Sequence, residues 1–311
     1  MNNDKRKIAV QFFGHLRTYE KCAISVKKYL LDEYDCDVFI HTWNKTESST
    51  LSCHDMCKIN DVDADVINNL RDLYNPKLIS IEEQDFNLYN DSLIPCQHNS
   101  GIKVISSRGM KFMLHSKIKV NELRKNYQRD NNIKYDYVVM IRPDIELYKK
   151  FILDESIREI ELLGLKQGRY CAVNCINNKE FPIIGGLATD ILYFASPNIM
   201  DKIMEVFQYI DFTLIGENGF YNPETYFVLE LQKRGIESYF LGYKYKESWD
   251  IVRSKNGRTA FKDFLKVKVN RKIFLVSFLE CLNMNIVNME LYLFNRFKLL
   301  FRIGNEVKYI D

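Results

Sequence analysis

The chain has 311 residues, of which 46% are apolar and 27% are charged, the balance of a folded globular protein. Its 44 Lys and Arg nearly match its 41 Asp and Glu, which argues against a nucleic-acid-binding protein, because those carry a basic excess. The charge is unevenly distributed, with 14 basic and 7 acidic residues from Leu241 to the end, against 30 and 34 in residues 1–240. The sequence therefore predicts an acidic body with a basic tail.

The start of the chain and its cysteines predict a cytoplasmic protein with reduced thiols. The apolar run Ile8–Phe13 is too short for the core of a signal peptide, and cytosolic cysteines are normally reduced. An alternative interpretation of the eight cysteines pairs Cys53 and Cys57 with Cys171 and Cys175 as a zinc site. Charged residues interrupt the apolar tail at 273–303, so we expect no membrane-spanning helix there.

The first forty residues predict a parallel sheet. Residues 7–13 form a short apolar run that ends at Gly14 and is typical of a buried strand. A helix from Arg17 or Thr18 to Leu31 and a strand at Asp37–His41 complete a strand–helix–strand unit. Further along we expect helices at 61–75, Ser107–Tyr127, Pro197–Ile210 and Pro223–Arg234, strands at Lys77–Glu82, Tyr135–Ile141, 170–176, Ile191–Ala195 and Ile236–Leu241, and loops at 44–60, 83–102 and Ile183–Ala188.

The most informative segment is the end of the strand Tyr135–Ile141. Arg142 and Asp144 follow it directly, and Glu146 lies two residues further on. In α/β sheets ligands bind beyond the carboxyl ends of the strands, and two carboxylates there suit Mg²⁺ or Mn²⁺ bound to a diphosphate. The alternative is that Asp144 caps a turn and Glu146 is solvated. We predict metal ligands at Asp144 and Glu146, with Arg142 binding the phosphates.

A second candidate binding segment, Gly14–Arg17, follows the first strand. Glycine allows a ligand to approach the backbone closely, and a helix start favours anions, so Gly14 and Arg17 are predicted to bind the same ligand. The sequence has no G-x-G-x-x-G and no P-loop motif, which argues against a dinucleotide-binding Rossmann fold and a P-loop NTPase.

Other polar residues are candidates with simpler explanations beside them. Trp43 could stack on a base or sugar, although Trp is also an ordinary core residue, and His41 is interpreted as structural. Glu224 could be a general base, but a carboxylate in a first helical turn is also favoured by the helix dipole. Asp190 is a weaker candidate of the same kind.

Three segments in this order resemble bacterial cell-surface polysaccharide glycosyltransferases, which act in lipooligosaccharide, O-antigen or capsule assembly. They are Ile8–Tyr19, Asp37–Trp43 and Tyr135–Asp144. The resemblance implies a GT-A-like fold with one nucleotide-sugar-binding α/β domain, here residues 1–254. It implies that Asp144 binds metal and the donor diphosphate, with Glu146 as the second acid of the Asp-x-Asp motif. Gly14, Arg17 and Trp43 then map to the donor pocket and Glu224 to the acceptor side.

The resemblance gives the basic tail, residues 255–311, an interpretation. Lys262, Lys266 and Lys268 precede an apolar stretch, as in an amphipathic helix on an anionic membrane. We therefore expect peripheral association with the inner membrane and a lipid-linked or oligosaccharide acceptor; alternatively, the tail packs on its own core or forms a homodimer. The other functions left open are a phosphoryl-type or nucleotidyl transferase and a non-enzymatic zinc-stabilised binding module.

Overall fold

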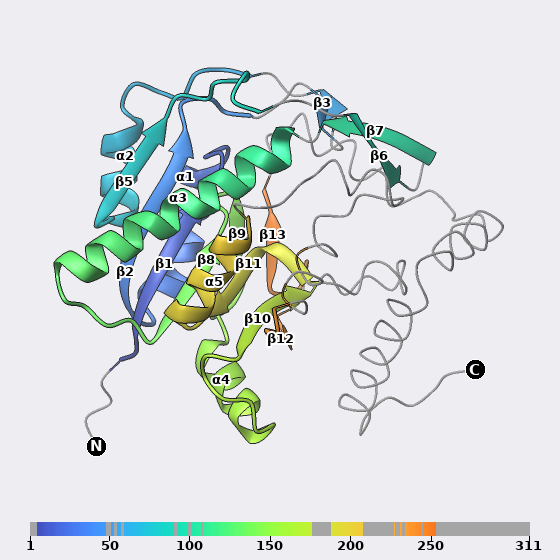
Figure 1. Ribbon diagram of the computed structural model, residues 1–311. Helices are drawn as coiled ribbons and strands as arrows, with labels where there is room; N and C mark the ends of the chain where they lie inside the picture. Colours follow the sequence, from blue (N-terminus) through green and yellow to red (C-terminus); the bar gives the residue numbers. More distant parts are fainter. Residues whose placement is uncertain are drawn as a thin grey trace.

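The computed structural model confirms the α/β class and the mainly parallel sheet. It describes residues 5–47, 51–52, 55–56, 59–89, 93–98, 101–106, 108–175, 188–207, 234–243 and 245–252, together with Phe227 and Leu231. The central sheet has seven strands in the order β12-β10-β11-β8-β1-β2-β5 (Figure 1). These strands are β1 (Lys7–Phe13), β2 (Asp35–Trp43), β5 (Leu78–Glu82), β8 (Tyr137–Ile141), β10 (Tyr170–Cys175), β11 (Ala188–Ala195) and β12 (Glu237–Leu241).

The pairing of the strands defines where the sheet changes direction. Strands β8, β1, β2 and β5 are parallel neighbours. Strand β11 runs antiparallel to both β8 and β10, while β12 is parallel to β10. The chain therefore builds one parallel half outward from β1 through β2 to β5, and returns to the other side of β1 with β8.

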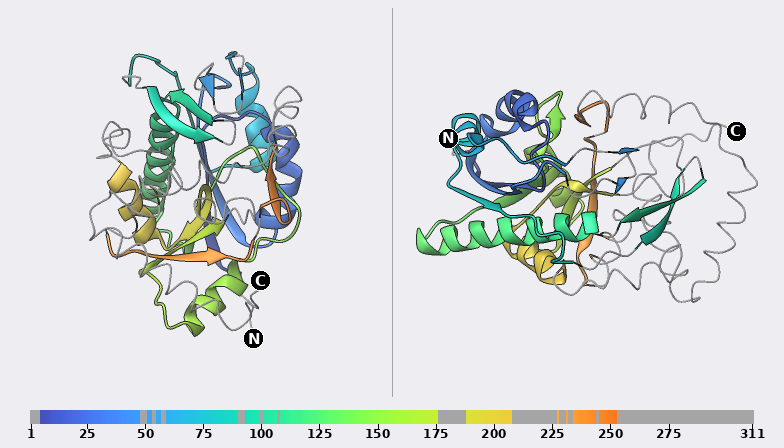
Figure 2. Two further views of the ribbon diagram at one scale, coloured as in Figure 1. Left: turned by 90° about the vertical axis from the view of Figure 1, so that its right-hand side faces the viewer. Right: turned by 90° about the horizontal axis from the view of Figure 1, so that it is seen from above.

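Helices cover both faces of the sheet. Helices α3 (Arg108–Asp130) and α5 (Pro197–Phe207) lie on one face, and α1 (Tyr19–Val26) and α2 (Val66–Tyr74) lie on the other (Figure 2). A π-helical segment, Lys27–Leu31, continues α1, so the predicted helix to Leu31 is confirmed with a change of winding near its end. Helix α4 (Leu153–Leu162) contributes Leu153, Ile157 and Ile160 to the same core as α1 and α2.

The alternation of side chains along β1 explains why two cores form. Ile8, Val10 and Phe12 belong to the core beneath α1 and α2, whereas Ala9 and Phe13 belong to the core beneath α3 and α5. Successive residues of a strand point to opposite faces, so a continuous apolar run is the pattern expected for a strand buried on both sides.

The structure differs from the predictions in three places. The predicted loop at 83–102 contains β6 (Leu93–His98), which pairs with β7 (Gly101–Ser106) as a two-stranded ribbon outside the main sheet. Pro95 in this segment indicated a loop, but proline is tolerated in an edge strand. The short strands β9 (Ile145–Leu147) and β13 (Trp249–Ile251) pair with each other and are too short to predict from periodicity. Two-residue strands β3 (Leu51–Ser52) and β4 (Asp55–Met56) interrupt the irregular segment 44–60.

Several predictions lie outside the described residues. These are most of the helix at Pro223–Arg234, the tail at 255–311, and the cysteines at positions 53 and 57. The division into a domain at 1–254 and an extension at 255–311 therefore stays a prediction. Among the residues that the structure describes, no helix combines the length and apolar character needed to cross a membrane.

Candidate functional site

The first candidate site lies at the carboxyl ends of β1 and β8, which are adjacent and parallel. Strand β1 is also paired with β2 on its other side. After β1 the chain therefore continues to β2 on one side of this pair, and after β8 it continues to β10 on the other side. In doubly wound folds ligands bind in the crevice at such a switch point. The residues that follow the two strands, Gly14–Arg17 and Arg142–Asp144, are therefore brought to one place.

Gly14 makes the turn after β1 with a backbone φ of +88°. This conformation strains residues with a Cβ, and glycine adopts it freely. The Gly14 N–H donates to Ser116 Oγ at 2.7 Å. Gly14 thus serves the turn, and its N–H is bonded within the protein; its predicted contact with a donor stays a prediction.

Arg17 lies next to this turn, also in the left-handed region, with a φ of +51°. Its guanidinium donates to both carboxylate oxygens of Glu47 at 2.8 Å, and to Asp144 Oδ2 at 3.3 Å. Non-glycine residues in this backbone region cost on the order of 1–3 kcal/mol and cluster at functional sites. The paired carboxylates of Glu47 and Asp144 are what hold the strained Arg17 in place.

Asp144 is completely buried and accepts hydrogen bonds from two arginines. Arg142 donates from Nε to Asp144 Oδ1 at 2.9 Å and from its Nη2 to Oδ2, in addition to the contact from Arg17. Burial alone lowers the pKa of Arg17, but the carboxylates of Asp144 and Glu47 outweigh it and raise that pKa above its usual value. We call Arg17, Glu47, Arg142 and Asp144 the arginine cluster.

The hydrogen bonds of the arginine cluster occupy the carboxylate of Asp144, which the sequence predicts to be a metal ligand. Both carboxylate oxygens already accept hydrogen bonds from guanidinium groups, whereas a divalent cation needs free oxygen ligands. Glu146, the other predicted ligand, is half-buried in β9 opposite Asp250 of β13. The prediction that Asp144 and Glu146 hold Mn²⁺ or Mg²⁺ therefore stays a prediction, and no reaction step is assigned to it.

His15 borders the arginine cluster. Its Nε2 lies 2.8 Å from Gln84 Oε1, and Gln84 donates in turn to the Glu47 backbone oxygen. Burial, together with the neighbouring positive charge of Arg17, lowers the pKa of His15 to about 3. His15 is therefore a neutral spacer beside the guanidinium groups.

The remaining predicted site residues lie elsewhere or outside the described part. Asp190 is buried in β11 with its carboxylate 3.5 Å from the Lys117 ammonium. Trp43 is fully buried and packs its ring against Phe112 at 5.0 Å, so stacking on a donor would require its neighbours to move. Glu224 lies outside the described residues. The structure thus brings Arg17, Arg142 and Asp144 together, and the roles of these residues stay predictions.

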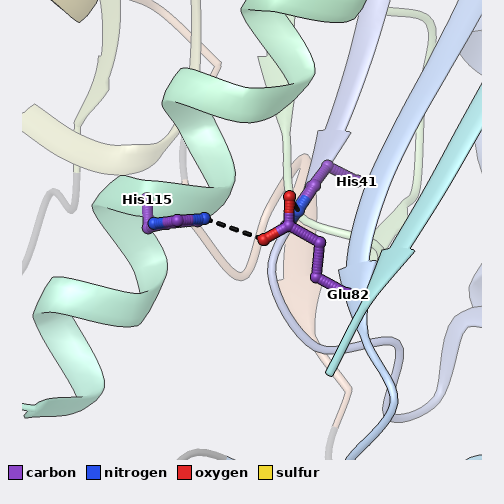
Figure 3. Close-up of side chains that lie close together, drawn as sticks. All are labelled: His41, Glu82 and His115. Carbon is purple, nitrogen blue, oxygen red and sulfur yellow. Dashed lines mark hydrogen bonds and ion pairs between the residues drawn. The ribbon is translucent and has the colours of Figure 1, made fainter. Parts of the chain in front are cut away.

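A second polar cluster occupies the next part of the same sheet edge, where His41 of β2, Glu82 of β5 and His115 of α3 converge (Figure 3). His115 Nε2 lies 2.9 Å from one Glu82 oxygen, and His41 Nε2 lies 3.4 Å from the other. One ligand atom from each residue lies within 4.8 Å of the others, an arrangement compatible with a divalent cation. We call these three residues the histidine cluster.

The charges of the histidine cluster depend on its hydrogen bonds. When their facing nitrogens carry protons, His41 and then His115 lower the pKa of Glu82 to about 2, against the opposing effect of burial. Burial lowers the pKa of His41 although Glu82 acts to raise it. Glu82 is therefore ionised at neutral pH and faces a histidine that burial keeps from protonating.

Sequence reasoning missed Glu47, Glu82 and His115. Glu47 lies in the irregular segment 44–60, and no periodicity places it near Arg17. The position of Glu82 near the site could have been predicted, because Glu82 ends the predicted strand Lys77–Glu82 and parallel strands end at one edge of a sheet. The position of His115 depends on how α3 packs across the sheet. His41 was interpreted as structural, and its full burial agrees with that interpretation.

No protein-family model matches the sequence, and no curated protein matches it either. Among solved structures, the chain is similar to the apo-form glycosyltransferase GlyE of Streptococcus pneumoniae TIGR4, with a TM-score of 0.37 and 12% sequence identity. The match covers 76% of this chain and 45% of the GlyE chain, so the chain spans less than half of that protein. A similarity at this level establishes neither fold family nor activity.

Proposed function

We propose that the chain is a glycosyltransferase that moves a sugar from a nucleotide-sugar donor to a hydroxyl of a growing cell-surface glycan. The observation that carries the proposal is the convergence of Arg17 and Arg142 on buried Asp144 at the switch point of the sheet. The three sequence segments that resemble surface-glycan glycosyltransferases include these same residues. The arginine cluster is thus the proposed site of the donor diphosphate.

The chemistry of glycosyl transfer explains why arginines belong at this site. As the bond from the anomeric carbon to the diphosphate breaks, the sugar acquires positive charge and the leaving group acquires negative charge. Fixed guanidinium groups stabilise that developing negative charge without having to reorganise. Arg17 and Arg142 also present planar forks that match phosphate oxygens. Binding would exchange part of their contact with Glu47 and Asp144 for contact with phosphate.

The residues proposed to act on the acceptor hydroxyl are Glu224 and Asp190. If the reaction inverts configuration, a carboxylate such as that of Glu224 deprotonates the acceptor hydroxyl. The Asp190 carboxylate lies 3.5 Å from the Lys117 ammonium. The acceptor is proposed to be a lipid-linked or oligosaccharide glycan, and the basic segment 255–311 is proposed to hold the enzyme on an anionic membrane surface.

The test is a panel of nucleotide sugars screened with the full chain, with and without Mn²⁺. We expect at least one UDP-, GDP- or CMP-sugar to raise the melting temperature and to be hydrolysed or transferred with release of its nucleotide. Transfer of a phosphoryl or nucleotidyl group in place of the sugar would identify the alternative enzyme class. The absence of any response to the whole panel would contradict the proposal.

A matched pair of variants links that activity to the arginine cluster. Arg17→Lys keeps the positive charge but loses the planar fork that binds Glu47 through two hydrogen bonds. We expect donor affinity to fall on the order of 10-fold, about 1.4 kcal/mol. Arg129→Lys is the control, because Arg129 is an exposed residue at the end of α3 paired only locally with Asp130. Equal affinity in both variants would remove Arg17 from the donor site.

A further inference from the structure

We propose that the histidine cluster is a binding site for a late first-row divalent cation of the Zn²⁺ type, separate from the arginine cluster. Its ligands would be His41 Nε2, His115 Nε2 and a carboxylate oxygen of Glu82. Two imidazoles and one carboxylate form a donor set that zinc uses in sites that keep one coordination position open. Imidazole ligands also select against Mg²⁺ and Ca²⁺, which prefer oxygen.

The spacing of the three side chains fits such an ion. Tetrahedral ligands at about 2.1 Å from zinc lie about 3.4 Å apart. The His41 Nε2–Glu82 Oε1 distance is 3.4 Å and the His115 Nε2–Glu82 Oε2 distance is 2.9 Å. The two distances run to different Glu82 oxygens, and one ligand atom from each residue lies within 4.8 Å of the others. The three side chains would therefore have to close in modestly to hold one cation between them.

The hydrogen bonds of His41 leave its Nε2 turned toward Glu82 without a hydrogen-bond partner. Ser116 Oγ donates to the His41 carbonyl at 3.1 Å and accepts from the Gly14 N–H. The arrangement that satisfies every contact of this hydroxyl has His41 Nδ1–H donating to it at 2.8 Å. Neutral His41 then carries a lone pair on Nε2, and this buried atom has no hydrogen-bond partner. A lone pair facing a carboxylate is unfavourable unless a cation lies between them.

The second ring nitrogens are also held as they are in metal sites. His115 Nδ1 lies 2.7 Å from the Tyr89 hydroxyl, and His41 Nδ1 lies 2.8 Å from Ser116 Oγ. Metal-bound histidines almost always bond through their other nitrogen, which fixes the ring and its tautomer. Both rings are therefore oriented by hydroxyl groups with Nε2 toward Glu82, and neither needs to turn to bind an ion.

The exposure of the ligands gives the ion a way in. The side chain of His41 is fully buried, but those of His115 and Glu82 are 18% and 34% exposed. An ion could enter past Glu82 and retain a water molecule on that side. Because the ligands come from β2, β5 and α3, the bound ion would also tie α3 to the edge of the sheet.

The test uses the full chain stripped of metal with a chelator and titrated with Zn²⁺ or Co²⁺. We expect one equivalent to bind, the melting temperature to rise, and Mg²⁺ to be unable to compete. Bound Co²⁺ should show the visible absorption of a four- or five-coordinate ion without the near-ultraviolet band of thiolate ligation. That spectrum separates this site from adventitious binding by the eight cysteines.

Single-ligand variants locate the ion. His115→Gln and Glu82→Gln change partly exposed side chains and should weaken Zn²⁺ binding at least on the order of 100-fold, while Ser116→Ala should weaken it on the order of 10- to 100-fold. Glu83→Gln, at the exposed neighbouring position, is the matched control and should bind as the wild type does. Equal binding by all variants, thiolate absorption, or no binding at micromolar Zn²⁺ would overturn the proposal. None of these measurements depends on nucleotide binding, so the proposed cation site can be supported or contradicted independently of the proposed transferase activity.

Discussion

The two polar clusters at the carboxyl edge of the sheet differ in how their charges are balanced. In the arginine cluster each carboxylate faces a guanidinium, and guanidinium groups stay positive at any physiological pH. In the histidine cluster one carboxylate faces two imidazoles, whose charge depends on a proton or a metal. The charges of the arginine cluster are therefore balanced without a ligand, whereas the carboxylate of the histidine cluster faces no permanently charged cation.

This difference indicates what each cluster is suited to bind. Guanidinium groups held by carboxylates can exchange those partners for the phosphates of an anionic ligand. Imidazole nitrogens facing an ionised carboxylate favour a cation. One sheet edge thus presents the proposed anion site after β1 and β8 and the proposed cation site at the ends of β2 and β5. Ser116 lies between them and contacts both Gly14 and His41.

The largest effect is expected from removing the acid at the centre of the arginine cluster. Asp144→Ala leaves Arg142 and part of Arg17 without their buried partner, and breaking a buried ion pair costs about 3–5 kcal/mol. Sugar transfer should fall on the order of 100-fold or more, because the two guanidinium groups lose their alignment. Urea denaturation and turnover of the donor measure the two effects.

Glu82→Gln gives the comparison for that change. In metal-free protein its cost in unfolding free energy should be well below that of Asp144→Ala, since Glu82 is partly exposed and Asp144 is not. If both variants were equally unstable, the contrast between a charge-balanced and a charge-deficient cluster would be wrong.

A smaller effect is expected from pH, through His15. The pKa of His15 is about 3 in the folded protein and about 6.5 when unfolded. A folded pKa below the unfolded value means that the unfolded state takes up the proton first. Stability is therefore full above pH 6.5 and falls by up to about 1.4 kcal/mol per pH unit as the pH drops toward 3.

His15→Asn isolates that contribution, because an amide can still donate to Gln84 but does not titrate. We expect the unfolding free energy of this variant, measured in urea at pH 7 and pH 5, to change less with pH than that of the wild type. The same pH dependence in both proteins would show that His15 is not held neutral beside Arg17.

The smallest effect is expected from Gly14→Ala. An alanine there must adopt a φ near +88°, which costs about 1–2 kcal/mol, but its Cβ would meet no atom within 4 Å. The fold should therefore persist with a modest loss in urea-denaturation midpoint, and Zn²⁺ affinity should stay close to wild type. A loss above about 4 kcal/mol would mean that the turn couples the two clusters more tightly than its contacts indicate.

Much of the sheet could be predicted from the sequence because its strands are buried on both faces. The apolar runs ending at Gly14 and at Arg142 marked β1 and β8, and the rule for parallel sheets predicted that their following residues would form a site. The partners of those residues could not be predicted in the same way. Glu47 approaches Arg17 through an irregular segment, and His115 meets Glu82 only because of how α3 crosses the sheet.

The roles predicted for Asp144 and Trp43 depend on contacts that the sequence does not show. Asp144 alone suggested a metal ligand, but the sequence could not show that Arg17 reaches back to share it with Arg142. Trp43 suggested a stacking surface, and the sequence could not show that Phe112 of α3 packs edge-on against its ring. Strand ends can be predicted from local patterns, whereas side-chain partners depend on contacts between distant segments.

The most direct test of the proposed donor site is calorimetric titration of UDP and GDP into the wild type and the Arg142→Lys variant. We predict that a nucleoside diphosphate binds the wild type with an affinity that falls as salt is added, because salt screens the attraction between the guanidinium groups and the diphosphate. Arg142→Lys should bind at least about 10-fold more weakly, since lysine lacks the planar fork. Wild-type affinity in Arg142→Lys, or no binding of either diphosphate to the wild type, would contradict the assignment of the arginine cluster as a donor site.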